Sequence, residues 1–460
     1  MVHARKCVDD ATNQNELTSC GWRFLTSQPH TFYMHSGASP RTEDPNTNHS
    51  KFVFQIVVGS NKLRGSMGAT ASSHHHCTEA EPPLAEDVTP HANPEELFNS
   101  YAADPNNHGW TGADSTFSVK LPDGRLLWLF SDTYLGPLNC DGTRPTSTRM
   151  INNCFVAQSG NTLTTITGGS ETNRTAIMPP PAEGRWFWLG DGIISNMHHT
   201  EYLQVIFQEY QRTESEGPLA FKFVRNVVAT FDLADLARPI KVDPLPSETC
   251  TSWGSAILPQ AHSGDNHTYI YGVKGDALNK TMRIARFRGS DLSKNWEFLR
   301  RSSTPNDDGH CDVEWTHSES KGTDALEGIV NEFSVTPWND GQFMVVSQDS
   351  SEIFSAKILM WSSCDPSGPF QKIDSPLYRM PESGPSGNYK NSNVVGYNAH
   401  VHPTLQEGDR WTLSYNVNSL DNRISPEGDN YRDPTIYRPR FVSFKLIPSK
   451  HGSGNENHIA

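Results

Sequence analysis

The stretch GWTGADSTFSVKLPDGRLLWLFSDTYLG, residues 109–136, has the pattern of a β-hairpin. A short apolar run, STFSV, is followed by the turn sequence PDG and by a second apolar run, LLWLF. Asp114 stands just before the first run and Asp132 just after the second. Antiparallel pairing brings the start of one strand beside the end of the other. The hairpin therefore predicts two carboxylates at the same end of an otherwise apolar unit.

The same pattern recurs four more times along the chain. The copies are WLGDGIISNMHHTEYLQVIFQEYQ (188–211), TSWGSAILPQAHSGDNHTYIYGVK (251–274), VNEFSVTPWNDGQFMVVSQDSS (330–351) and YNAHVHPTLQEGDRWTLSYNVNS (397–419). Their equivalent first positions are Asp114, Asp191, Trp253, Glu332 and Asn398, which are 77, 62, 79 and 66 residues apart, 71 on average. Recurrence at a long period indicates an array of similar supersecondary units.

Further alternating runs lie between the copies, for example CFVAQSGNTLTTI (154–166) and FKFVRNVVATFDL (221–233), and each is readable as two outer strands. Four strands in each of five repeats predict an all-β fold, a five-bladed β-propeller with four-stranded antiparallel blades. A pair of β-sandwiches is the alternative, but it would not need this recurrence. Few residues follow the fifth hairpin, so we expect its outer strand to be missing or supplied by the segment before Gly109.

We expect three regions along the chain. Residues 1–95 are polar and irregular in pattern, residues 96–447 form the propeller, and residues 448–460 form a polar tail. The sequence HHHC at 74–77 could bind a metal, but a chance cluster in a low-complexity segment is the simpler interpretation.

Composition limits the partners. The 460 residues include 38 basic and 52 acidic ones, for a net charge of −14, which does not suit a nucleic-acid partner. The best apolar run, FVFQIVVG (53–60), is far shorter than the roughly 18 residues that span a bilayer. We therefore expect that the protein binds neither nucleic acid nor membranes. We also expect a monomer.

Eight cysteines show no spacing typical of a zinc site, so disulfides are expected, first between Cys140 and Cys154, which flank one loop. The sequons at Asn48, Asn173, Asn266 and Asn279 are typical of a secreted glycoprotein. The first twenty residues lack the apolar core of a signal peptide. We expect a secreted protein whose natural N-terminus is not Met1, with unconventional export as the alternative.

In a propeller the innermost strand of each blade lies along the axis, so the hairpin ends share one funnel. Asp114 and Asp132 face it, as do Glu332 with Asp349 and Asp191 with Glu209. Converging carboxylates push their pKa values apart, so that one stays protonated while another ionises. Glycoside hydrolysis needs such a pair. Aromatic, amide and imidazole groups suited to sugars lie nearby: Trp110, Trp186, Trp188, Trp253, Asn331, Asn398, His400 and His402.

The arrangement resembles the furanosidase-type propellers, glycoside hydrolases that act on arabinans, xylans and fructans. The segments GWTGADSTFSVKLPDGRLLWLFSDTYLG, FWLGDG, NEFSV and YNAHVHP resemble more closely the DUF4185/DUF5005-type group of secreted five-bladed propellers, over residues from about 100 to 447. The resemblance implies hydrolysis of a furanose-containing, arabinan-like polysaccharide or oligosaccharide. A carbohydrate-binding propeller without catalysis, similar to a lectin, is the alternative.

The resemblance also implies roles for three catalytic residues. Asp114 matches the first-blade aspartate used as base or nucleophile, and Asp191 matches the second-blade aspartate that orients and tunes its partners. The better-known families place the acid on the third blade, but the third copy here begins TSWGSAIL, and the carboxylate nearest to this start is Glu248, four residues before Ser252. Glu332 on the fourth blade is therefore the candidate acid.

Eight further residues are candidates for substrate binding: Asp132, Trp188, Trp253, Asn331, Asp349, Asn398, His400 and His402. Structural roles stay open for several. Asp132 and Asp349 could accept hydrogen bonds at strand ends, and the tryptophans could belong to the core. Asp191 could be a turn residue and Glu332 a paired structural carboxylate. The two histidines could stack on substrate, fill the funnel wall or hold a structural cation in the axial channel; no other cofactor or metal is expected.

Overall fold

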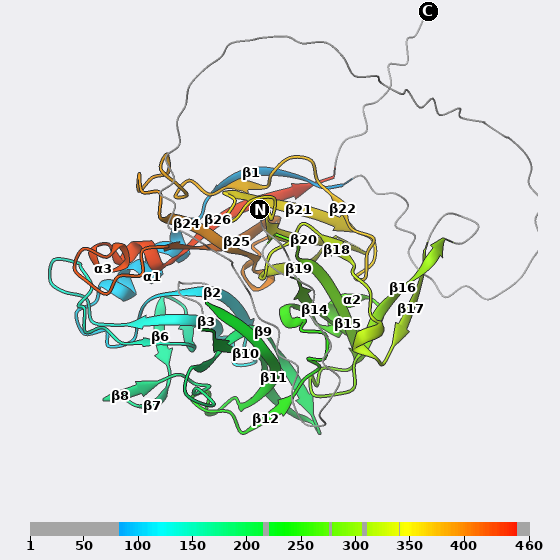
Figure 1. The fold of residues 1–460 in the computed structure, drawn as a ribbon, viewed down its shortest axis with the longest axis horizontal. Helices are drawn as coiled ribbons and strands as arrows, with labels where there is room; N and C mark the ends of the chain where they lie inside the picture. Colours follow the sequence, from blue (N-terminus) through cyan, green and yellow to red (C-terminus); the bar gives the residue numbers. More distant parts are fainter. Residues whose placement is uncertain (1–81, 215–219, 276–277, 306–310, 340, 449–460) are drawn as a thin grey trace, which may run out of the picture. The chain divides into compact units, whose positions relative to one another are not determined.

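The computed structural model describes residues 82–214, 220–275, 278–305, 311–339 and 341–448. Their antiparallel sheets form the five blades of a β-propeller, which confirms the predicted fold (Figure 1). The sequence HHHC at 74–77 and the sequon at Asn48 lie outside the described residues.

Each blade is a sheet whose strands follow one another from the axis outward. Blade 1 contains β2 (Trp110–Lys120), β3 (Leu126–Leu135), β5 (Cys154–Ser159) and β6 (Thr162–Ile166), with β4 (Met150–Ile151) beside β3. Blade 2 contains β9 (Arg185–Met197), β10 (Thr200–Arg212), β11 (Phe221–Asp232) and β12 (Lys241–Pro244). Blade 3 contains β13 (Ser252–Leu258), β14 (His267–Lys274), β15 (Thr281–Arg288), β16 (Glu297–Pro305) and β17 (Cys311–Thr316), with β18 (Leu326–Glu327) beside β15.

The last two blades complete the ring. Blade 4 contains β19 (Phe333–Asn339), β20 (Gln342–Gln348), β21 (Lys357–Ser363) and β22 (Gln371–Lys372), with β23 (Tyr378–Arg379) beside β21. Blade 5 contains β24 (Val394–Val401), β25 (Arg410–Ser419), β26 (Pro439–Ile447) and β1 (Leu84–Pro90). Outside the blades lie the hairpin β7 (Gly168–Ser170) and β8 (Asn173–Thr175), the helices α1 (Ala92–Ala103), α2 (Gln260–Ser263) and α3 (Asp429–Arg432), and the 3₁₀ turns η1 (Glu319–Lys321), η2 (Pro403–Leu405) and η3 (Pro434–Tyr437).

The five hairpins predicted from the sequence are the five inner strand pairs. In the first, the turn closes with a hydrogen bond of 3.0 Å from the Gly124 amide to the Leu121 carbonyl. Gly124 has a φ of 92°, which glycine adopts without the steric cost of a Cβ atom. The inner strands β2, β9, β13, β19 and β24 each contact the inner strands of both neighbouring blades, so the ring is closed at its axis.

The hydrophobic core is divided among the five interfaces between blades. Blades 1 and 2, for example, enclose Phe155 and Phe231, whose ring centroids are 5.3 Å apart. Corresponding clusters lie between blades 2 and 3, 3 and 4, 4 and 5, and 5 and 1. A blade is therefore buried on both faces, which explains why inner strands such as LLWLF read as continuous apolar runs.

The ring is closed by a segment that the sequence did not assign to it. β1 pairs antiparallel with β26, from Leu84 opposite Ile447 to Pro90 opposite Val442. The helix α1 follows, and its buried Phe98 packs on Trp110 at a centroid distance of 4.8 Å. The expected boundary at residue 95 is therefore too late. The outer strand of blade 5 comes from before Gly109, which was one of the two alternatives.

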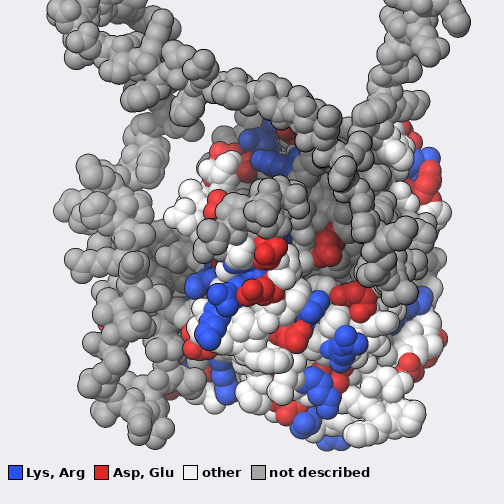
Figure 2. Space-filling view, turned by 90° about the vertical axis from the view of Figure 1, so that its right-hand side faces the viewer, with Lys and Arg blue, Asp and Glu red and all other residues white. Residues whose placement is uncertain are grey.

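The expected disulfide between Cys140 and Cys154 is wrong, because both thiols are free. Cys154 begins β5 and points into the core of blade 1, where burial raises the pKa of its thiol to about 12. Cys140 lies on an exposed turn. Acidic and basic side chains are intermixed on the face shown in Figure 2. In the described part of the chain, no helix is long and apolar enough to cross a membrane.

We predict that β1 contributes measurably to stability. A chain starting at residue 92 should unfold at a temperature about 2 °C or more below that of a chain starting at residue 82, because it loses five paired positions and exposes the edge of β26. Thermal unfolding followed by circular dichroism compares the two directly. Equal midpoints would show that β1 does not hold the ring closed.

Candidate active site

A distorted part of β2 carries Asp114. The register with β3 shifts between Ala113 and Ser115 and again between Ser115 and Phe117. Ser115 and Thr116 have φ angles of 72° and 71°. A β-branched residue in this left-handed region is strained, at a cost of about 1–3 kcal/mol. The bulge aims the Asp114 and Ser115 side chains at groups on blades 4 and 5.

Asp114 lies deep in the ring but is still partly reached by solvent. The Tyr397 hydroxyl donates to its Oδ2 at 2.8 Å, whereas Oδ1 is buried without a hydrogen-bond partner among the described residues. Burial, followed by repulsion from Asp132 and Glu332, raises the pKa of Asp114 well above its usual value. The phenols of Tyr397 and Tyr437 act in the opposite direction. Asp132 and Glu332 are therefore close enough to influence ionisation of Asp114.

Asp132 lies near the end of β3, and the hydrogen bonds to its carboxylate fall on one oxygen. Its Oδ1 accepts hydrogen bonds from Asn152 Nδ2 at 2.9 Å and from Trp188 Nε1 at 2.8 Å. Burial raises the pKa of Asp132 to about 6, although both hydrogen bonds lower it. Trp188 comes from blade 2, so this carboxylate connects two blades at the axial end of their inner strands.

Glu332 directly precedes β19 and joins three blades. Its Oε1 accepts hydrogen bonds from Ser115 Oγ at 2.9 Å and Asn398 Nδ2 at 3.0 Å. Its Oε2 lies 2.8 Å from His400 Nε2. Asn398 has a φ of 56°, so a second strained position serves the same carboxylate. Both oxygens of Glu332 are thus engaged, while 18% of its side chain stays exposed.

Asp191 joins blades 2 and 3 through backbone amides. Its Oδ1 accepts from the Gly192 amide and its Oδ2 from the Ile257 amide, both at 2.8 Å. Burial raises the pKa of Asp191 to about 6, while those hydrogen bonds and the charge of His400 lower it. These contacts suit a residue that positions its neighbours.

Two residues predicted to bind substrate lie in other surroundings. Trp253 is buried, and its Nε1 donates to Glu319 at 3.0 Å. Asp349 accepts hydrogen bonds from Ser351 and Ser355 at its strand end, which lower its pKa although burial opposes this. Both therefore have structural contacts that the sequence left open as alternatives.

His402 is also part of the core. Its Nδ1 lies 2.8 Å from Ser118 Oγ and its Nε2 2.8 Å from Ser414 Oγ. Burial lowers the pKa of His402 to about 3, so the ring is neutral at physiological pH. Asn331 is exposed, and its backbone carbonyl accepts from Ser255 Oγ at 2.7 Å.

Two further residues placed in the funnel by sequence have other partners. Glu209 is fully buried between Arg185 and Arg225, with ion pairs of 2.8 and 2.6 Å. Trp110 is completely buried against α1. Trp186 and Trp188, by contrast, are partly exposed and pack together at 5.5 Å between ring centroids.

Sequence reasoning missed three residues of the cluster. Tyr397 directly precedes Asn398 in the segment YNAHVHP, so its position beside a candidate residue was a usable signal. Ser115 likewise follows Asp114. Asn152 lies in the loop between β4 and β5, and nothing in its local sequence indicates that it bonds Asp132.

Among the described residues, no group of three or more His, Cys, Asp or Glu side chains is arranged to hold a metal ion. His400 contacts Glu332, and this carboxylate also accepts hydrogen bonds from Ser115 and Asn398. The axial cation considered from the sequence stays a prediction.

The fold and this cluster define a class, a five-bladed β-propeller with carboxyl groups gathered where its blades meet. The chain belongs to the family described as "Domain of unknown function (DUF5005)", which it matches over residues 95–446. This selects DUF5005 rather than DUF4185 from the group named by resemblance, and the match starts after β1. No curated protein matches the sequence.

Several solved structures are similar to this chain. A protein from Bacteroides ovatus named as a "putative hydrolase" superimposes with a TM-score of 0.61 at 21% identity, over 78% of this chain and 90% of that one. An α-L-arabinofuranosidase from Podospora anserina, in complex with cellotriose, has a TM-score of 0.39 at 9% identity, over 75% and 94% of the two chains. A GH43 β-xylosidase/α-arabinofuranosidase from a compost microbial metagenome has a TM-score of 0.40 at 14% identity, over 81% and 96%.

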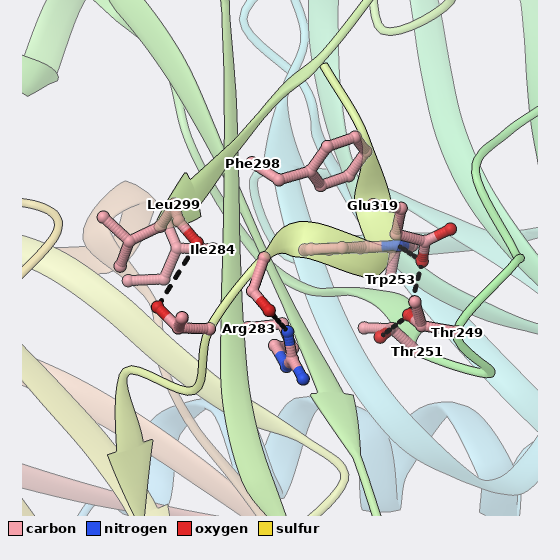
Figure 3. A pocket seen from close by; sticks show the side chains of 10 residues that line it. Thr249, Thr251, Trp253, Arg283, Ile284, Phe298, Leu299 and Glu319 are labelled. Carbon is pink, nitrogen blue, oxygen red and sulfur yellow. Dashed lines mark hydrogen bonds between the residues drawn. The ribbon is translucent and has the colours of Figure 1, made fainter. Parts of the chain in front are cut away.

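Glu319, the partner of Trp253, should be a stabilising residue. Figure 3 shows its carboxylate between the Trp253 indole and Thr249, and it accepts hydrogen bonds from both and from the Glu248 amide. Glu319→Gln places an amide among these donors and should lower the free energy of unfolding by about 1–3 kcal/mol. Glu327→Gln, at an exposed position, is the control and should change it by less than about 0.5 kcal/mol. Equal effects in urea unfolding would contradict this role.

Replacing Asp132 should raise stability, whereas replacing Glu319 should lower it. Its folded-state pKa of about 6 exceeds the ordinary 3.8, so ionisation above that range opposes folding, while below the ordinary value there is no penalty. Asp132→Asn keeps an oxygen for Asn152 and Trp188 and removes the charge. The free energy of unfolding of the variant should exceed that of the wild type by on the order of 1 kcal/mol at about pH 8 and should equal it at about pH 3.5. A loss of stability at the higher pH would contradict this interpretation.

Proposed function

We propose that the protein is a glycoside hydrolase that cleaves a furanose-containing, arabinan-like polysaccharide or oligosaccharide in the axial carboxylate cluster. The observation that carries the proposal is that Asp132 and Glu332 both oppose ionisation of Asp114. Carboxyl groups that repel one another divide into protonated and ionised members, as acid–base cleavage of a glycosidic bond requires.

Asp114 is the proposed base or nucleophile, acting through Oδ2, which it shares with Tyr397. Its Oδ1 is buried, so Oδ2 is the oxygen left for a reaction. Asp191 and Glu332 are proposed to hold the surrounding groups. Asp191 uses both oxygens on backbone amides, and Glu332 uses both on three side chains.

The partly exposed Trp188 and Asn398 are proposed to contact the sugar. Trp188 belongs to an aromatic group with Tyr210 and Phe221, at centroid distances of 4.7 and 4.9 Å. The Bacteroides ovatus protein named as a hydrolase agrees with the reaction class. The furanose-containing substrate depends on the resemblance of the sequence motifs. Secretion and the monomeric state stay predictions.

The test starts with the full chain on arabinans, fructans, galactans and xylans. On the substrate that is cut, Asp114→Asn should fold normally but lose at least about 10²–10⁴-fold in kcat/KM, because it removes a group that acts in the transition state. Asp374→Asn, at an exposed position far in sequence from the cluster, is the matched control and should keep full activity.

Two outcomes would contradict this function. Near-normal turnover of Asp114→Asn would remove that residue from its role. A chain that binds these oligosaccharides but cuts none of them would be a carbohydrate-binding propeller similar to a lectin.

A further inference from the structure

The four carboxyl groups of the cluster differ in which oxygen is available. Asp191 and Glu332 have hydrogen-bond donors on both oxygens. Asp114 has Tyr397 on Oδ2, and its Oδ1 is buried. Among these four, Asp132 alone has one oxygen that accepts two hydrogen bonds and a second oxygen that has no donor and is not buried.

The contacts of Asp132 fix where its proton sits. Asn152 Nδ2 and Trp188 Nε1 both donate to Oδ1, at 2.9 and 2.8 Å. An oxygen that accepts two N–H bonds has no room for a proton of its own, because a carboxyl oxygen offers two lone-pair sites. Oδ2 accepts no hydrogen bond in the described structure and is not one of its buried unpaired oxygens. The neutral acid therefore carries its proton on Oδ2, where solvent or substrate reaches it.

We propose that Asp132, rather than Glu332, is the proton donor to the leaving group in the reaction. This assignment depends on the proposed glycosidase function. The Oδ2 proton passes to the glycosidic oxygen as its bond to the anomeric carbon breaks. With Asp114 as base, water adds to that carbon and gives its proton to Asp114. Asp114 then releases that proton and Asp132 takes one up from solvent, which restores both groups.

The surroundings favour the protonated acid. The titratable groups near Asp132 are Asp114 on β2, Tyr134 on the same strand and Tyr437 on η3. None of them is a cation, and Asp114 and Asp132 repel each other when both are ionised. Burial raises the pKa of Asp132 to about 6, so the acid is populated in mildly acidic solution.

Trp188 couples this proton to substrate binding. Its indole N–H orients Asp132, while its ring is partly exposed beside Trp186. A sugar stacked on this ring would lie next to the carboxyl group. Trp188 therefore serves as a positioning residue for the donor as well as a proposed contact for the sugar.

Leaving-group dependence tests the proposal. A 4-nitrophenyl glycoside of the sugar that the wild type cuts releases a stable phenolate and needs no proton, whereas the natural oligosaccharide releases an alkoxide and does. Asp132→Asn should lose about 10²–10⁴-fold in kcat/KM on the oligosaccharide and much less on the nitrophenyl glycoside. Asp114→Asn should lose activity on both. The Asp132 variant should also lose the alkaline limb of the pH–rate profile.

The pH–rate profile of Trp188→Phe is a second test, because a purely structural role of Asp132 would not change this profile. It keeps an aromatic ring but removes the hydrogen bond that lowers the pKa of Asp132. The donor would then stay protonated to a higher pH, so the alkaline limb should move upward. Phe221→Tyr is the control and should leave the limb in place, because Phe221 belongs to the same aromatic group but donates no hydrogen bond to Asp132.

The outcomes separate the two proposals. Equal losses of Asp132→Asn on both substrates, or a selective loss in Glu332→Gln instead, would overturn Asp132 as the donor while the hydrolase function stands. A wild type that cuts neither substrate would overturn the function and the donor together.

Discussion

The hydrogen bonds of Glu332 are the contacts on which the rest of the axial cluster depends. They join Ser115 of blade 1 and Asn398 and His400 of blade 5 to a residue at the start of blade 4. They fix the positions of these side chains relative to one another at the axis of the ring. The same contacts require a bulge in β2 and a left-handed Asn398, so the backbone is strained where the blades meet. The hydrophobic interfaces between blades offset that strain and the burial of several carboxyl groups.

The blade architecture could be predicted because its signals are local. An inner hairpin needs only a turn and two apolar runs, and five of them at a long period leave few alternatives to a ring. The closing strand could not be found in this way. β1 pairs with β26 at the other end of the chain, and five of its seven residues are exposed, so it carries no apolar pattern. The family match, which starts at residue 95, omits it as well.

The carboxylate positions followed from strand geometry, but side-chain direction did not. Asp114, Asp132 and Glu332 meet because hairpin ends meet, whatever the details of register. Trp253 occupies the equivalent position on blade 3, yet the register of β13 with β14 shifts directly after it, and its ring turns into the core beside Glu319. Asp349 is turned to Ser351 and Ser355 in its own loop. A one-residue change in register reverses which face a side chain takes, and no sequence signal marked these shifts.

Chemical differences within the cluster come from residues of neighbouring blades and of a loop. Asp114 and Asp132 are nearly equivalent in sequence, as the two ends of one hairpin. They become unlike because Tyr397 of blade 5 donates to the first, while Asn152 from a loop and Trp188 of blade 2 donate to one oxygen of the second. A symmetric pair of buried carboxylates could exchange roles. In this pair, solvent reaches Oδ2 of Asp132, whereas Oδ1 of Asp114 is buried. The ring thus gathers the carboxyl groups, and contacts from neighbouring blades decide which of them can transfer a proton.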